Sequence, residues 1–571
     1  MSEADEIVDA GRAAHRRGAI QQAAEQYRRA LGLDPNHAMA LAGLGVVALQ
    51  SGTPAEAGTY LQRAAQLAPE NPTIQNNLGN VLIATGDAAG AEAAFNAALA
   101  ADPTLIDALY NRAVARHHLR RRNEAEADYR AVLKQDPGRI DAAINLAAVL
   151  RETENLPDAI AVLEDALSTA PPHPDAILSL ATLYETVGRA GEAASVLDQL
   201  PPDRQADPQA ILVRARLALR RGEAEAGLSC LEELSGEAPP SALRQAAYIR
   251  GLLLDRQGRH AEAFDAFSHA NSLMRAGRPD ADTLAGRYRD RIAAYRKAIP
   301  TLAQEVARLS SAPTAPLPFD LVFFCGFPRS GTTLMEQILA AHPDTGTTGE
   351  DSPLHRLYES FPMDGADAMP FALLSGVSID QREALRRAFV DLVKKQLGTC
   401  DGRTVIDKLP LNLVELGIIE LLFPEARILV AIRDPRDCVL SAFMQPFRLN
   451  EAMACLLTPG DAAQTYIDVF DLYQEQKARS ALAIAEYRYE DLVRDFDGTL
   501  RGVIEFLGLS WTEDLARYRD RLAGKYISTP SYMAVSQSLN TRAIGRWRNY
   551  ESVLGDTLDR LAPMAARHGY T

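Results

Sequence analysis

The stretch "FFCGFPRSGTTLMEQIL", residues 323–339, passes from an apolar run through a glycine-containing loop into an amphipathic segment. This order predicts a buried strand, a turn and the start of a helix, where backbone N–H groups bind an anion. Gly326 and Gly331 are five residues apart, as in a Walker A loop, but Thr332 replaces the lysine of that loop. The sequence therefore predicts a site for a compact phosphate or sulfate group, and it disfavours a kinase or an ATPase.

The segments after residue 319 alternate between short apolar runs and amphipathic stretches. This alternation predicts a parallel sheet covered by helices, with ligands bound at the carboxyl ends of the strands. The expected strands lie within "FDLVFFCG" (319–326), "RTVIDK" (403–408), "ARILVAIRD" (426–434) and "LAIAEYRYEDL" (482–492).

A second candidate anion motif lies in "ILVAIRDPRDCVLSAF", where Arg433 ends an expected strand and Ser441 follows eight residues later. An arginine fork and a hydroxyl together suit a phosphate group. The structural alternative is an ordinary strand end, in which Arg433 pairs with Asp434 or Asp437.

The N-terminal half of the chain repeats with a period of 34 residues. Two series carry small residues, and a third series follows the second by four positions with large apolar ones. The series are Gly11, Gly45, Gly79, Ala113, Ala147, Ala181 and Ala215; Ala23, Ala57, Ala91, Ala125, Ala159, Ala193 and Gly227; and Tyr27, Leu61, Phe95, Tyr129, Leu163, Leu197 and Leu231.

This repeat pattern resembles the tetratricopeptide (TPR) repeat. Two antiparallel helices approach closely where one face carries Gly or Ala, and a large residue one turn later fills the adjoining hole. Gly251, Ala263 and Phe267 keep the spacing but arrive two residues late, which predicts an eighth repeat. The alternative is an alanine-rich bundle with accidental periodicity. A solenoid groove can hold a peptide, a partner protein or another part of the same chain.

Composition limits the other classes of function. The chain has 571 residues and a net charge of −15, which indicates several domains and disfavours a nucleic-acid partner. Its five cysteines lack metal-ligand spacing, so we expect neither a disulfide framework nor a metal site. The acidic start lacks an apolar signal region and no run is long enough to span a membrane, so we expect a cytoplasmic protein.

The pattern changes set the expected domain boundaries. Residues 1–275 are expected to form the solenoid, and 276–318 a helical connector that ends in the proline-rich "SSAPTAPLP". Residues 319–571 then form the second domain. The predicted fold class is an N-terminal TPR α-solenoid followed by a P-loop-like α/β domain with a central parallel sheet.

Several motifs of the second domain together resemble PAPS-dependent sulfotransferases, and the tyrosylprotein sulfotransferases in particular. They are "PRSGTTLM", "AHPD" followed by a Gly-Glu, "DKLP", "FPEARILVAIRD" and "YEDL". The resemblance covers most of residues 319–550. With the repeats in front, the whole chain resembles a bacterial TPR-containing sulfotransferase.

The resemblance implies that 3′-phosphoadenosine 5′-phosphosulfate (PAPS) is the donor and 3′,5′-ADP the product, with no metal. It places the 5′-phosphosulfate on the first loop and the 3′-phosphate on Arg433 and Ser441. Tyr489 of "YEDL" lies on the adenine or 3′-phosphate side, or only packs against its strand. The first-loop residues are Arg329, Ser330, Gly331, Thr332 and Thr333.

The same resemblance assigns the chemistry. Lys408 of "DKLP" is expected to donate to the bridging oxygen as the S–O bond breaks, unless it is only a surface lysine at a strand end. Glu350 is expected to take the proton of the acceptor hydroxyl. Asp351 is the alternative base because the family has Gly-Glu-Glu where this chain has Gly-Glu-Asp. The structural alternative is a surface turn in which both acids are only solvated.

A third motif near the C-terminus is "YISTPSYMAVSQSLNTRAIGRWRNYE". It resembles the tyrosylprotein sulfotransferases in the spacing of a donor-binding serine and lysine. Ser531 takes the serine position, and Arg546 replaces the lysine. The expected function is therefore sulfuryl transfer to a hydroxyl of a protein, peptide or glycan that the TPR groove recruits. The alternative is a TPR scaffold whose sulfotransferase-like domain is inactive.

Overall fold

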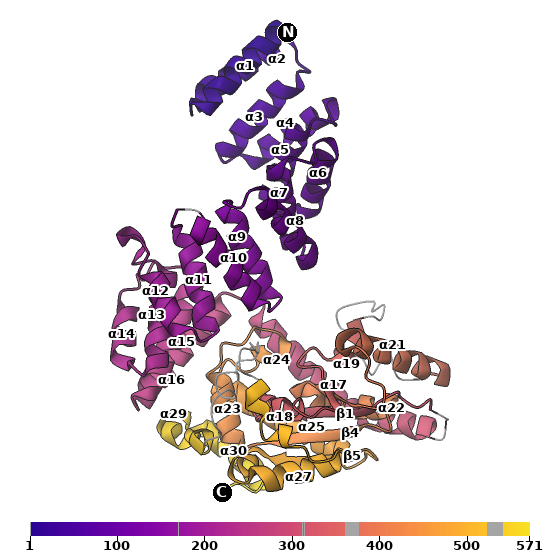
Figure 1. Cartoon of the computed structure of the whole chain (residues 1–571). Helices are drawn as coiled ribbons and strands as arrows, with labels where there is room; N and C mark the ends of the chain where they lie inside the picture. Colours follow the sequence, from indigo (N-terminus) through magenta and orange to yellow (C-terminus); the bar gives the residue numbers. More distant parts are fainter. Residues whose placement is uncertain (1, 170, 311, 313, 360–375, 522–540) are drawn as a thin grey trace. The chain divides into compact units, whose positions relative to one another are not determined.

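A computed structural model describes residues 2–169, 171–310, 312, 314–359, 376–521 and 541–571 (Figure 1). By contacts, the chain divides into two compact units, Met1–Val213 and Arg214–Thr571. Among the described residues, no helix is both long and apolar enough to span a bilayer.

Eight successive pairs of helices form the repeats, as the sequence predicted. The last pair begins after the longer loop that shifted its register. The pairs are α1 (Glu3–Arg16) and α2 (Ile20–Leu33), α3 (Ala38–Gln50) and α4 (Pro54–Leu67), α5 (Pro72–Ala84) and α6 (Ala88–Ala101), α7 (Ile106–His118) and α8 (Arg122–Gln135), α9 (Ile140–Glu152) and α10 (Leu156–Thr169), α11 (Pro174–Thr186) and α12 (Ala190–Leu197), α13 (Pro208–Arg221) and α14 (Ala224–Glu232), and α15 (Pro240–Arg256) and α16 (His260–Ala276).

The 34-residue series mark the closest contacts within the pairs. A Cβ atom added at Gly79 of α5 would lie 2.4 Å from the ring of Phe95 on α6. At the equivalent position of the last pair, a Cβ at Gly251 would lie 2.7 Å from the ring of Phe267. Small residues therefore recur because the large residue of the partner helix occupies the space of a side chain.

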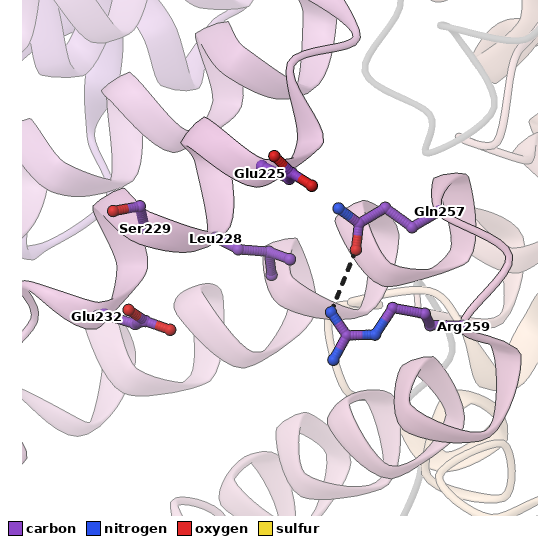
Figure 2. A pocket seen from close by; sticks show the side chains of 6 residues that line it. All are labelled: Glu225, Leu228, Ser229, Glu232, Gln257 and Arg259. Carbon is purple, nitrogen blue, oxygen red and sulfur yellow. Dashed lines mark hydrogen bonds between the residues drawn. The ribbon is translucent and has the colours of Figure 1, made fainter.

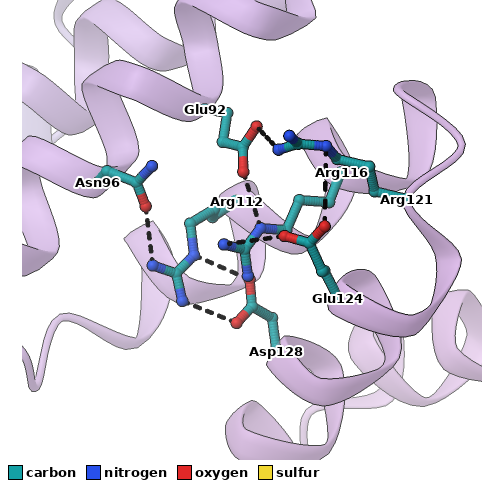
Figure 3. Close-up of polar contacts among 7 residues, drawn as sticks. All are labelled: Glu92, Asn96, Arg112, Arg116, Arg121, Glu124 and Asp128. Carbon is teal, nitrogen blue, oxygen red and sulfur yellow. Dashed lines mark hydrogen bonds and ion pairs between the residues drawn. The ribbon is translucent and has the colours of Figure 1, made fainter.

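A network of ion pairs joins α6, α7 and α8 of the solenoid (Figure 3). Arg112 and Arg116 of α7 both bond to Asp128 of α8, at 2.8 and 2.7 Å. Arg116 also bonds to Glu92 of α6 at 3.0 Å, and Arg121 pairs with the same carboxylate. The buried Asp128 and Glu92 are thus hydrogen-bonded, which offsets the cost of burying their charges.

The second domain contains a five-stranded sheet of order β2-β3-β1-β4-β5, in which all pairs are parallel. The four predicted strands are present, and the sequence missed the fifth because three residues carry no periodic signal. The strands are β1 (Asp320–Gly326), β2 (Thr345–Thr347), β3 (Thr404–Lys408), β4 (Arg427–Ile432) and β5 (Ala483–Arg488).

Each central strand sends alternate residues to two apolar layers. Phe323 and Cys325 of β1 pack into one layer with α22 (Leu416–Leu422), α23 (Pro435–Phe443) and α25 (Pro459–Lys477). Val322 and Phe324 pack into the other with α18 (Thr332–Leu339) and α27 (Phe496–Phe506). Burial on both faces fixes the strand register. The register in turn sets which residues lie at the carboxyl edge of the sheet, where β1, β3 and β4 end.

The expected connector contains α17 (Ala281–Ser310), a 30-residue helix. Its apolar stripe, which includes Tyr288, Ile292, Tyr295 and Leu302, lies in the same buried cluster as β1. The sequence suggested a connector because of the prolines that follow, but the stripe packs into the domain core. The boundaries 1–275, 276–318 and 319–571 remain a prediction about folding units.

Candidate active site

The first anion loop joins β1 to α18 at the carboxyl edge of the sheet. Gly331, the residue before α18, has φ of 94°, and a Cβ there would lie 2.5 Å from Tyr489. Arg329 also has a positive φ, 73°. This backbone path turns the first N–H groups of α18, which lack partners within the helix, toward the loop.

The loop also needs the second glycine, Gly326. A Cβ there would lie 2.6 Å from Ser330 Oγ and 3.0 Å from the carbonyl oxygen of Ala431 on β4. The Ser330 hydroxyl is buried and has no hydrogen-bond partner among the described residues. A buried hydroxyl without a partner costs free energy, which a bound oxyanion would recover.

The structure brings the two predicted anion motifs together. Arg329 Nε donates to Ser441 Oγ over 3.0 Å, and Arg433 Nη1 donates to the carbonyl oxygen of Arg329 over 2.8 Å. The Arg433 guanidinium lies 4.7 Å from the centre of the Tyr489 ring. The residues that directly follow β4 and β5 therefore converge with Ser441 of α23 on the loop after β1.

The structural alternative for Arg433 is wrong. Asp434 pairs with Arg436 at 2.8 Å, and Asp437 accepts from the backbone N–H groups of Gly545 and Trp547. Arg433 instead donates to two backbone carbonyls, those of Arg329 and Ala543. Its Nε is buried without a partner among the described residues, so a donor remains for a ligand.

Positive charge is concentrated in this part of the site. Burial and, to a smaller extent, the neighbouring charge of Arg433 lower the pKa of Arg329 to about 10. Two guanidinium groups held close together repel each other. An anion bound between them would relieve this repulsion and stabilise both charges.

Lys408 lies at the end of β3 and is fully buried, so the alternative of a surface lysine is wrong. Its Nζ lies 2.8 Å from Glu350 Oε1 and 3.1 Å from Glu336 Oε2. The two carboxylates offset the cost of burying the ammonium charge. The arrangement places a buried ammonium group and a half-exposed carboxylate in direct contact.

Glu336 is a residue that the sequence reasoning missed. Its side chain is 4% exposed on α18, whereas that of Glu350 is 47% exposed. Burial raises the pKa of Glu336, and the charge of Lys408 opposes this effect. The available signal was an acidic residue within a helix that the sequence already placed against the sheet.

Asp351 takes a different direction from Glu350. Its carboxylate forms an ion pair with Arg356, five residues later, and its side chain is 52% exposed. The pair leaves Asp351 engaged at the surface. Of the two adjacent acids, the structure places Glu350 against Lys408.

The C-terminal motif is only partly described. Ser531 lies outside the described residues, so its predicted role has no structural account. Arg546, at the start of the short helix η6 (Arg546–Tyr550), pairs with Asp255 of α15 at 2.7 Å. Thr332 and Thr333 are buried and form the first two residues of α18, whereas the sequence placed them in the loop, and their predicted contact with the donor stays a prediction.

No group of three metal-binding side chains occurs among the described residues. A hollow of about 650 Å³ lies beside α14 and the turn between α15 and α16, and Figure 2 shows the side chains that line it. Within it, Arg259 donates to Gln257 over 3.2 Å. None of its lining residues belongs to the predicted site; they are Glu225, Leu228, Ser229, Glu232, Gln257 and Arg259.

Comparisons with known proteins agree with this geometry. Residues 320–513 match the sulfotransferase family. Tetratricopeptide repeat models match residues 8–72, 48–116, 106–139, 150–217 and 212–281.

Individual relatives are distant. The chain is similar to protein-tyrosine sulfotransferase 2 of Gallus gallus, with 27% identity over 44% of this chain and 69% of the relative. It is also similar to protein-tyrosine sulfotransferase A of Caenorhabditis elegans, with 27% identity over 44% and 67%. An uncharacterized protein of Aquifex aeolicus aligns at 23% identity over 57% of this chain and 43% of its own length.

Proposed function

We propose that this chain, which joins tetratricopeptide repeats to a sulfotransferase domain, transfers a sulfuryl group from PAPS to a hydroxyl of a protein, peptide or glycan. The observation that carries the proposal is the Lys408–Glu350 pair beside two converging anion motifs. A protein or peptide is the favoured acceptor because the similar proteins are named protein-tyrosine sulfotransferases.

The residues present fit such a donor. The N–H groups at the start of α18, with Arg329 and the Ser330 hydroxyl, which lacks a partner in the described part of the chain, would hold the 5′-phosphosulfate. Arg433, whose Nε likewise has no partner there, and the Ser441 hydroxyl would hold the 3′-phosphate. Bound there, PAPS would supply an activated sulfuryl group and an adenosine bisphosphate leaving group.

Lys408 would act on the leaving group. Its ammonium donates to the oxygen on which negative charge builds as the bond to sulfur breaks. Glu336, buried beneath it, holds the ammonium on the donor side through the reaction. Because this contact is preorganised, the lysine needs no rearrangement when the charge develops.

Glu350 would act on the acceptor. Its side chain is half-exposed, so an acceptor hydroxyl has access to the carboxylate from solvent. On taking the acceptor proton, Glu350 becomes neutral and its attraction to Lys408 weakens. The Lys408 ammonium then interacts mainly with Glu336 and the leaving oxygen. Proton transfer to Glu350 therefore strengthens the contact of Lys408 with the leaving group.

Donor binding tests the proposal first. We expect 3′,5′-ADP to bind more tightly than AMP or ATP without Mg²⁺, because two anion motifs match two separated phosphates. Isothermal titration calorimetry on the full chain measures this order. A preference for ATP, or a strict Mg²⁺ requirement, would instead favour a nucleotide kinase or ATPase.

Turnover separates the proposal from the alternative of an inactive scaffold. A cell extract is incubated with the protein and PAPS carrying a labelled sulfuryl group, and the labelled acceptor is identified. Binding of 3′,5′-ADP without transfer of label would favour the scaffold.

Recruitment of the acceptor by the TPR groove and a cytoplasmic location are further parts of the proposal.

A further inference from the structure

The last helix pair of the solenoid, α15–α16, packs against the donor side of the sulfotransferase domain. Leu254 and Phe267 of this pair share one buried cluster with Leu440 and Phe443 of α23 and with Trp547. Leu440 and Phe443 flank Ser441, whose hydroxyl accepts from Arg329. The repeat pair therefore supports the helix that carries a predicted donor contact.

Polar contacts extend this packing to the segment Thr541–Tyr550. Asp255 of α15 accepts from Arg546 Nη2 at 2.7 Å and from the Tyr550 hydroxyl at 2.5 Å. The Asp255 side chain is 19% exposed, so these charged contacts are largely shielded from solvent. Asn271 of α16 adds bonds to the carbonyl oxygens of Phe443 and Leu457.

The same segment is held from the sulfotransferase side. The carbonyl oxygen of Ala543 accepts from Arg433, and the N–H groups of Gly545 and Trp547 donate to Asp437 over 2.6 and 2.9 Å. Thr541–Tyr550 is therefore fixed between the candidate donor site and the solenoid. Arg546 is its charged residue on the solenoid side.

A second side chain of α15 faces the same charges. Tyr248 packs against Phe267, with ring centres 5.8 Å apart. Burial raises the pKa of Tyr248 to about 12, while the charges of Arg329 and Arg546 act to lower it. The repeat pair thus lies near both a loop arginine and Arg546.

We propose that Asp255 is a positioning residue for donor binding, through which the last TPR pair completes the donor site. The inference rests on the proposed function, and it takes Arg546 as a donor contact because the sequence resemblance places Arg546 at a donor-binding position. Asp255 bonds one Nη of Arg546, and a guanidinium has five N–H donors. The contact therefore orients the fork and leaves donors for an anion.

The alternative is that Asp255 keeps Arg546 away from the donor, and it predicts the opposite change in donor affinity. If Asp255 withheld Arg546 from the donor, its removal would free the guanidinium and tighten binding. Positioning predicts weaker binding, because an unrestrained arginine must be ordered when the anion arrives. The direction of the change therefore decides between the two.

The test uses the full chain and 3′,5′-ADP in isothermal titration calorimetry. We expect Asp255→Ala to weaken binding about tenfold, the scale of one charged hydrogen bond. Asp255→Asn, which keeps one acceptor oxygen, should fall between Asp255→Ala and wild type. Asp265→Ala, which removes an exposed acid from α16, is the matched control and should bind as wild type does.

A double-mutant cycle separates positioning from general destabilisation. In an Arg546→Ala background, Asp255→Ala should weaken 3′,5′-ADP no further, because it acts through Arg546. Thermal unfolding confirms that each variant is folded at the assay temperature. Unchanged or tighter binding by Asp255→Ala, or a full tenfold loss in the Arg546→Ala background, would overturn the inference.

Hydrogen exchange gives a readout that does not depend on the donor. Without ligand, Asp255→Ala should speed amide exchange in the peptide that contains residues 545–550, while Asp265→Ala should not. Unchanged exchange in Asp255→Ala would overturn the inference that Asp255 holds this segment. If the wild-type chain failed to bind 3′,5′-ADP although exchange rose in Asp255→Ala as expected, the proposed function would be wrong and the structural role of Asp255 correct.

Discussion

At the scale of single residues, the site depends on how charges are distributed around Lys408. A buried ammonium with two carboxylate neighbours is stable only while at least one of them is ionised and close. Glu336 is buried and Glu350 is half-exposed, so the two acids have different access to an acceptor. Burial therefore separates a carboxylate that is shielded from solvent beside the lysine, Glu336, from one that solvent also reaches, Glu350.

The first prediction concerns this division. Glu350→Gln should lower turnover by about 10²–10⁴-fold, the range for loss of a general base, and leave 3′,5′-ADP affinity near that of wild type. Asp351→Asn is the matched control and should keep most activity, because Asp351 pairs with Arg356 instead. Steady-state kinetics and calorimetry measure both quantities. Nearly normal turnover in Glu350→Gln together with an inactive Asp351→Asn would show that Asp351, and not Glu350, is the general base.

The second prediction concerns Asp407, which precedes Lys408. Burial raises its pKa from 3.8 to about 6, and hydrogen bonds from Ser352 and Leu354 limit the rise. A raised carboxyl pKa favours the protonated form in the folded state. Its stabilisation is therefore complete below pH 4 and is lost as the pH rises to 6.

Asp407→Asn should remove that pH dependence, because the amide does not ionise. The free energy of unfolding of wild type minus that of the variant should fall by about 2–3 kcal/mol between pH 4 and pH 7. Urea unfolding at several pH values measures it. Asp401→Asn, at an exposed acid six residues earlier, should keep the wild-type profile; parallel profiles for wild type and Asp407→Asn would contradict the assignment.

At the scale of elements, the repeat helices depend on the volume available at each glycine. A Cβ at Gly79 of α5 would lie 2.4 Å from Phe95, whereas one at Gly58 of α4 would come no closer than 3.7 Å to Val81. The two glycines share helical backbone but differ in the space around them. This difference isolates packing from helix propensity.

The third prediction uses that pair. Gly58→Ala should stabilise the chain by about 0.5–1 kcal/mol, because alanine favours helix over glycine. Gly79→Ala should destabilise it by about 1–2 kcal/mol, because overpacking against Phe95 exceeds the gain in propensity. Urea unfolding followed by circular dichroism compares them. Stabilisation by both substitutions would show that α5 and α6 separate at little cost.

At the scale of the whole molecule, the unit that folds together begins before the sheet domain. Residues 214–571 form one compact unit that includes α14–α17. Tyr288, Ile292 and Leu302 of α17 lie in the cluster that covers one face of the sheet. A cut after α17 therefore exposes a large apolar surface of the catalytic domain.

The fourth prediction compares two fragments. A fragment of residues 208–571, which starts with the whole of α13, should unfold cooperatively and bind 3′,5′-ADP like the full chain. A fragment of residues 311–571 should fail to unfold cooperatively, because it lacks α17 and the Asp255 contact. Thermal unfolding and calorimetry measure both. Equal binding by the shorter fragment would show that the sheet domain folds without the solenoid's last pair.

The sequence determined the features that local patterns encode. The 34-residue period predicted seven helix pairs and the retained internal spacing predicted the eighth, because each pair buries the same positions against its neighbour. Alternating apolar runs predicted four of the five strands, and the stretch around Gly326 and Gly331 predicted a strand, a loop and a helix in that order. The comparisons then matched the two expected families over these regions.

Only the tertiary structure decided which side chains meet. Lys408 contacts Glu350 across 58 residues of sequence, and Arg546 contacts Asp255 across 291. Periodicity gives the face of a helix or strand that is buried, but not the element that covers it. Glu336, α17 and Asp255 took their places in the fold through packing between distant elements, for which no local pattern in the chain carries a signal.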